Sequence, residues 1–94
     1  MDKYFNAIVD GLNLQDIEVL NVLTSTRATS LLSAITRKEV NDKVSYSEAI
    51  FRKTLQRLEA IKFVNVVTGN KEHSIYATEF GQNAINLIAE RNEV

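Results

Sequence analysis

The chain has 94 residues, of which 45% are hydrophobic and 24% are charged. This length suffices for one domain with a modest core, and the composition is ordinary for a globular protein. The absence of Cys excludes a disulfide framework and a thiolate metal site. No stretch approaches the roughly 20 apolar residues that a membrane-spanning helix requires, and residues 1–6 show no secretion signal. We therefore expect a cytoplasmic protein.

The formal net charge is −1, but the two signs are separated along the sequence. Residues 27–62 carry eight cations and four anions, a net of +4, whereas the remaining residues carry three cations and eight anions, a net of −5. A ligand responds more to a nearby patch than to the distant total. The middle of the chain is therefore compatible with a polyanionic partner, although charges scattered over a solvated surface remain the alternative.

Helical periodicity dominates the first half of the sequence. Residues 1–12 place their apolar side chains on one side of a helix. Asn13 is a good N-cap for a second helix, which we expect to reach about residue 23, with Asp16 in its first turn. The polar run 24–26 ends it because these side chains compete for backbone hydrogen bonds. We expect a third helix from Thr29 or Ser30 through Val40, followed by a turn at 41–43.

The second half predicts a long helix, a hairpin and a last helix. Ser45 or Ser47 can cap a helix over residues 45–62, and a capping box between Ser45 and Glu48 is available by spacing. Residues 64–67 and 73–77 predict two strands around a turn at 68–72, and a helix follows over 79–92. The expected fold is mainly α with a two-stranded β-hairpin. Neither proline nor a linker interrupts the sequence, so residues 1–94 are expected to form one domain.

Three segments carry a resemblance to a known family: LQDIEVL at 14–20, SEAIFRKTLQRLEAIKFV at 47–64, and IYATEFG at 75–81. Together they resemble the winged helix-turn-helix superfamily, in particular the small dimeric MarR-like and PadR-like regulators. The resemblance implies a recognition helix at 45–62, a wing hairpin at 64–77, and extra N- and C-terminal helices at 1–12 and 79–92 through which such proteins often dimerise on duplex DNA. One departure is Phe63, where these families often have Gly, so a differently shaped turn is expected there.

The phase of the long helix predicts which residues would face DNA. If Phe51, Leu55 and Leu58 face the core, Lys53 points away from it and Arg52 flanks it. Arg can read guanine and Gln can read adenine in the major groove. The candidates for contact from this helix are Ser45, Tyr46, Ser47, Ala49, Arg52, Lys53, Gln56 and Arg57. The alternative is a solvated helix face, with Arg52 or Lys53 paired to Glu48.

Further candidates lie outside the long helix. Arg27 and Lys43 could clamp phosphates, a contact that positions a protein without reading sequence. Lys71 and His73 at the hairpin tip could reach phosphate or the minor groove. A plain exposed turn, with Lys71 neutralised by Glu72, is the equal alternative.

Surplus apolar surface at the two ends of the chain predicts a homodimer. The expected interface residues are Tyr4, Phe5, Ile8, Ile85 and Ile88, although some of them could instead be tucked into the protein's own core. His73 is the sole histidine, which argues against a metal site. We find no nucleophile–base pair and no glycine-rich phosphate loop. We therefore expect neither an enzyme nor a cofactor or small-molecule ligand.

These inferences favour a sequence-specific, homodimeric protein that binds double-stranded DNA, with transcriptional regulation as the leading role. A plasmid or viral centromere-binding protein, or a replication accessory protein, would use the same surface. A winged-helix module that binds protein and not DNA is the alternative from a different class.

Overall fold

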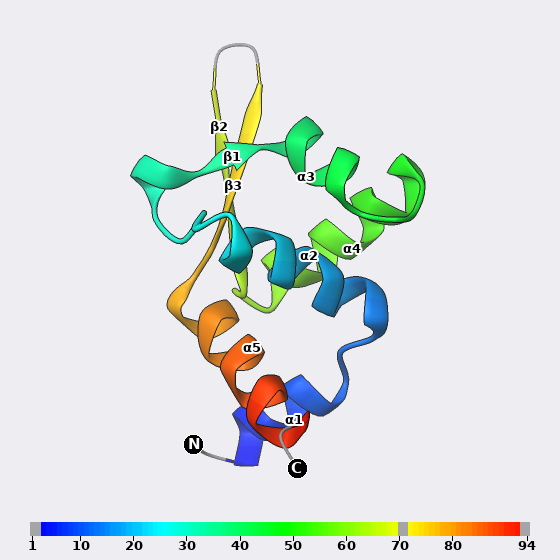
Figure 1. The fold of residues 1–94 in the computed structure, drawn as a ribbon, viewed down its shortest axis with the longest axis vertical. Coiled ribbons are helices and arrows are strands. Elements are labelled where there is room, and N and C mark those ends of the chain that lie inside the picture. Colours follow the sequence, from blue (N-terminus) through cyan, green and yellow to red (C-terminus); the bar gives the residue numbers. More distant parts are fainter. Residues whose placement is uncertain (1–2, 70–71, 93–94) are drawn as a thin grey trace.

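The computed structural model describes residues 3–69 and 72–92 (Figure 1). The helices are α1 (Lys3–Asp10), α2 (Leu14–Ser25), α3 (Arg37–Lys43), α4 (Glu48–Ala60) and α5 (Glu79–Asn92), with a 3₁₀ turn η1 at Leu31–Ser33. The strands are β1 (Ile35–Thr36), β2 (Val64–Thr68) and β3 (His73–Ala77). The predicted mainly helical fold with a β-hairpin is confirmed.

The core forms where α2 and α4 pack together beside the base of the hairpin. Val19, Leu20 and Leu23 of α2 are fully buried. Phe51 and Leu58 of α4 are also fully buried, and the Leu55 side chain is only 5% exposed. The predicted phase of the long helix is therefore confirmed, and its opposite face is left outside.

The sheet contains one more strand than the sequence predicts. Its order is β1-β3-β2 with antiparallel pairing throughout, and Ile75 at the centre faces Ile35 on one side and Val66 on the other. β1 is two residues long and lies in a segment that the sequence assigns to a helix. Pairing with β3 satisfies backbone groups that local periodicity does not report on.

The predicted third helix is wrong in its position. It begins at Arg37, where the side chain of Thr36 caps it by accepting the N–H of Glu39 at 3.1 Å, and it continues through Lys43. Residues 41–43 are thus its last turn and not a separate turn. The prediction placed Leu31 and Leu32 on the buried face of a helix. In the structure these side chains are 61% and 99% exposed, so no helix face is buried there.

The turn out of α4 is closed without glycine. Lys62 adopts the left-handed conformation (φ 68°), and the Phe63 N–H donates to the Leu58 carbonyl at 2.9 Å. This is a Schellman ending in which Lys takes the position that usually favours glycine. Phe63 then turns inward and its ring lies 5.9 Å from that of Phe5. The different turn expected at Phe63 is accounted for by this arrangement.

The start of α5 is locked onto the same turn. The Thr78 hydroxyl donates to the Lys62 carbonyl at 2.6 Å. A Cβ atom at Gly81 would lie 2.2 Å from the Phe63 carbonyl oxygen, so only glycine fits. The hydroxyl contact accounts for Thr78 and the close approach for Gly81 in the TEFG segment at 78–81.

α1 and α5 lie together at the end of the molecule opposite the hairpin (Figure 1). Arg91 joins them by donating to Asp10 at 2.5 Å and to Asn6 at 3.2 Å. Within residues 3–69 and 72–92, no helix combines the length and apolar character needed to cross a bilayer.

Candidate nucleic-acid interface

The exposed surface of α4 begins at a well-capped N-terminus. The Ser47 side chain is the N-cap and accepts the N–H of Ile50 at 3.5 Å, so Glu48 is the first helical residue. The structure does not form the predicted capping box between Ser45 and Glu48. Helix α4 ends at Ala60, two residues before the predicted end at residue 62.

Ala49, Lys53 and Gln56 lie on the exposed face of α4, opposite the buried stripe. This is the placement that the helical phase predicts. A small residue, a cation and an amide in successive turns leave the helix free to approach another molecule closely. Their contact with DNA remains a prediction.

Arg52 flanks this face and is paired within its own helix. Its guanidinium donates to the Glu48 carboxylate at 3.1 Å, and the two side chains are 58% and 67% exposed. This is the pairing with Glu48 that the sequence analysis gave as the alternative to DNA contact for Arg52. Both side chains stay accessible from solvent.

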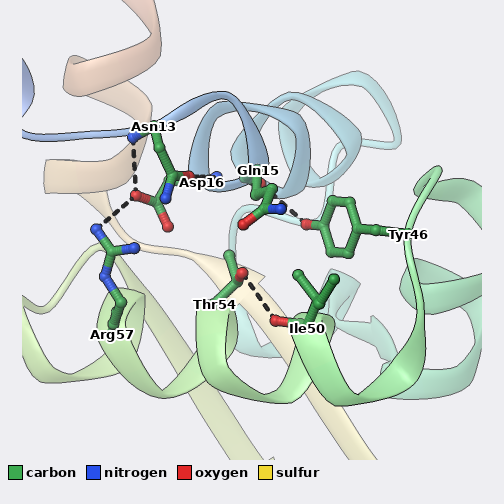
Figure 2. A network of polar contacts seen from close by, with 7 residues as sticks. All are labelled: Asn13, Gln15, Asp16, Tyr46, Ile50, Thr54 and Arg57. Atoms are coloured by element: carbon green, nitrogen blue, oxygen red, sulfur yellow. Dashed lines mark hydrogen bonds and ion pairs between the residues drawn. The ribbon is translucent and has the colours of Figure 1, made fainter.

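Arg57 pairs with α2 within the fold, while 53% of its side chain stays exposed. Its contact with DNA remains a prediction. Its guanidinium donates to Asp16 of α2 at 3.0 Å, and the Asp16 side chain is completely buried (Figure 2). Asp16 also forms a capping box with Asn13, with bonds of 3.0 and 2.8 Å. A buried carboxylate is costly without a cation, so Arg57 is committed to α2.

Ser45 and Tyr46 also hold the helix in place, although Ser45 stays exposed and Tyr46 is half-buried. Their contact with DNA remains a prediction. The backbone N–H and the hydroxyl of Ser45 donate to the Glu18 carboxylate at 2.8 and 3.1 Å. The Tyr46 hydroxyl donates to the Gln15 carbonyl at 2.9 Å (Figure 2). Partial burial, with a smaller contribution from the negative charge of Glu18, raises the pKa of Tyr46 to about 12.

The anchoring residues of α2 were missed by the sequence analysis. Gln15, Asp16 and Glu18 contact residues that are 27 to 41 positions away in the chain. One signal was available for Asp16, because it lies at helical spacing from Val19, Leu20 and Leu23 on the buried side of α2. A carboxylate on an apolar stripe indicates a buried acid that needs a cation.

A groove lies between α3, the start of α4 and the part of the hairpin next to its turn. It is lined by Thr36, Arg37, Lys38, Asn41, Asp42, Glu48, Phe51, Glu72 and His73. The Arg37 guanidinium sits 5.9 Å from the centre of the Phe51 ring, a cation–π contact. The structure therefore brings His73 close to the start of α4, as a wing residue would be.

The other sequence candidates are dispersed. Lys43 is exposed at the end of α3. Lys71 lies outside the described residues. Arg27 is exposed but sits at the opposite end of β3 from His73, since the carbonyl of the adjacent Ala28 accepts the N–H of Ala77. It is not brought together with the groove.

Comparison with solved structures defines the class of protein. BpsR of Bordetella bronchiseptica superposes with a TM-score of 0.73 at 19% identity, over 85% of this chain and 54% of that one. A putative MarR-like transcription regulator from Bacillus cereus ATCC 10987 gives a TM-score of 0.72 at 12% identity, over 85% and 55%. These likenesses confirm the winged helix-turn-helix fold with its added terminal helices, in which the β2–β3 hairpin is the wing.

A more similar protein identifies the family. The chain is 40% identical over 93 residues to the DNA-binding protein TubR of Priestia megaterium (strain ATCC 12872 / QMB1551), which covers 99% of this chain and 92% of that protein. The structure of TubR from Bacillus megaterium pBM400 superposes with a TM-score of 0.90 at 40% identity, over 94% of this chain and 98% of that one. No protein-family model matches the chain. The chain belongs to the TubR family.

Proposed function

We propose that this protein binds double-stranded DNA through the outward face of α4 and the neighbouring wing, and that it does so as a homodimer in the cytoplasm. One observation carries the proposal: a chain 40% identical to a named DNA-binding protein leaves Ala49, Lys53 and Gln56 exposed on its recognition helix. A binding role, and not catalysis, is proposed.

The chemistry of this face suits the major groove. Lys53 supplies a cation for phosphate or guanine, Gln56 can pair with adenine, and Ala49 permits close approach. Arg52 remains accessible beside them, with His73 across the groove and Lys43 further along α3. Ser45, Tyr46 and Arg57 fix α4 against α2, and the exposed Ser45 and Arg57 flank the same surface.

The terminal helices are the proposed dimer interface. Tyr4 is 78% exposed, whereas Ile8, Ile85 and Ile88 are partly buried against the core. Phe5 is removed from the predicted interface because it is only 8% exposed and packs on Phe63. An exposed aromatic residue next to half-buried isoleucines is what a second copy could cover.

Two biological roles fit such a dimer. The named transcription regulator among the structures described above matches at 12% identity, which supports a shared fold alone, while the relative at 40% identity is named a DNA-binding protein. Footprinting on DNA from the gene's own neighbourhood separates the roles. Protection over a promoter supports transcriptional regulation, and protection of sites unconnected with a promoter supports centromere binding.

The direct test is the salt dependence of binding to a labelled mixed-sequence duplex, measured by fluorescence anisotropy. Binding that neutralises several phosphates weakens steeply as salt rises. Lys53→Ala should lower the affinity and reduce the slope of log K against log salt by about one. Lys62→Gly is the matched control, because Lys62 is an exposed cation beyond the C-terminal end of α4 whose left-handed conformation glycine accepts. Absence of duplex binding at low salt would overturn the proposal and favour a protein-interaction module.

A further inference from the structure

We propose that Glu48 determines specificity by selecting a C·G base pair in the major groove, with Arg52 held beside it for the guanine. The inference rests on the proposed DNA-binding function and adds to it the identity of one recognised base pair.

Glu48 stands where the recognition helix would first enter a groove. It is the first residue of α4, its side chain is 67% exposed, and it lines the groove between α3 and the part of the wing next to its turn. The next residue, Ala49, belongs to the outward face. The Glu48 carboxylate is thus a hydrogen-bond acceptor at the N-terminal end of the surface proposed to meet DNA.

The carboxylate is not used to cap the helix. Ser47 provides the N-cap, and the N–H of Ser45, which a capping box would direct to Glu48, donates to Glu18. The Glu48 carboxylate instead pairs with the Arg52 guanidinium, 3.1 Å away and one turn further along. A four-residue spacing keeps the two side chains on the same side of the helix.

A carboxylate and a guanidinium together are complementary to one kind of base pair. Cytosine presents its N4 amino group as a donor in the major groove, and guanine presents N7 and O6 as acceptors. Glu48 can accept from the cytosine while Arg52, which has further N–H groups, donates to the guanine of the same or the adjoining pair. A guanine or a thymine opposite Glu48 would place acceptors against its negative charge.

The pair also limits binding to DNA of any sequence. Arg52 and Lys53 are the cations in the first two turns of α4, and Glu48 neutralises one of them. Phosphates repel a carboxylate, so Glu48 weakens sequence-independent attraction. Weaker sequence-independent attraction increases the difference in affinity between specific and non-specific DNA, in a chain whose formal net charge is −1.

The experiment is selection of bound sequences from a randomised duplex library with wild type, Glu48→Ala, Glu48→Gln and Glu39→Ala. Glu39 is the matched control because it is an exposed first-turn glutamate on the neighbouring α3. Wild type should prefer cytosine at one position, and E48A should lose that preference there alone, a change of roughly tenfold in discrimination. E48A should also bind mixed-sequence duplex more tightly. E48Q should shift the same position towards adenine, since an amide both donates and accepts. E39A should keep every preference.

Three results would overturn the inference: wild type that shows no cytosine preference, E48A and E48Q that both retain it, or either variant losing preference at all positions alike. Each can occur while wild type still binds duplex in a salt-dependent manner. Failure of the proposed function is a different result, in which wild type binds no duplex.

Discussion

Tyr46 illustrates how a side chain that sequence places at a ligand surface can instead be an anchor. It lies just before the recognition helix, where an aromatic hydroxyl could meet phosphate. In the folded chain its hydroxyl donates to the Gln15 carbonyl at 2.9 Å, and the side chain is partly buried near Glu18. Both burial and the neighbouring negative charge oppose ionisation, so the phenol stays protonated to unusually high pH.

Replacing Tyr46 with Phe should reveal this contact through the pH dependence of stability. Below pH 10 the variant should lose about 1 kcal/mol, the usual contribution of one hydrogen bond. The pKa of Tyr46 is raised from 10.0 to about 12 in the folded state. Between these values the unfolded chain has released its proton and the folded chain has kept it, so the folded state is progressively disfavoured as pH rises.

The measurement is urea unfolding of wild type and Tyr46→Phe at a series of pH values. The advantage of wild type should be fully present below pH 10 and should shrink as pH rises towards 12. Tyr4 and Tyr76 are present in both proteins, so the comparison isolates Tyr46. Curves that stay parallel over this range would show that Tyr46 is not held protonated by the fold.

At the scale of elements, α2 fixes α4 along its length. Glu18 and Gln15 accept hydrogen bonds from Ser45 and Tyr46, in the segment that enters the helix. Asp16 pairs with Arg57 in the last turn of α4 (Figure 2). The buried face of α4 adds apolar packing between these polar attachments. The direction of the exposed face is therefore set by contacts at both ends.

Two arginines on α4 provide a matched comparison of this attachment. Arg57→Ala should destabilise the protein by about 2–4 kcal/mol, because it leaves the Asp16 carboxylate buried without its cation. Arg52→Ala should cost no more than about 0.5 kcal/mol, since its partner Glu48 is exposed. Thermal and urea unfolding measure both. Equal losses would mean that the Asp16–Arg57 pair is no more important for stability than a surface pair.

At the scale of the whole molecule, the proposed DNA-binding and dimerisation surfaces occupy different parts of an elongated body. The molecule measures 41 × 26 × 23 Å, with the hairpin at one end of its long axis and α1 with α5 at the other (Figure 1). This separation allows a second copy to bind at one end while the wing stays accessible.

The interface can be tested by introducing charge at Tyr4. Tyr4→Asp should shift the protein from dimer to monomer in sedimentation velocity, with little change in its thermal stability, because the side chain is 78% exposed in the single chain. Leu32→Asp is the control, since Leu32 is 99% exposed on η1, outside both terminal helices. A Tyr4→Asp protein that remains dimeric would move the interface away from α1.

Much of this molecule follows from local patterns. The apolar spacing of Phe51, Leu55 and Leu58 determined the phase of α4, and the side chain of Asn13 determined where α2 begins. The strands of the hairpin were predicted from their β-branched residues and the turn between them. These features depend on neighbours within a few positions, so the sequence by itself carries them.

Tertiary structure decided which polar side chains have a partner elsewhere in the fold. Arg52, Arg57, Ser45 and Tyr46 look equally accessible in sequence, but buried Asp16 holds Arg57 and α2 holds the other end of the helix through Ser45 and Tyr46. The strand at Ile35–Thr36 likewise exists only because β3 pairs with it. Such contacts join residues far apart in the chain, and their free energy depends on burial and distance, which become defined only when the elements pack.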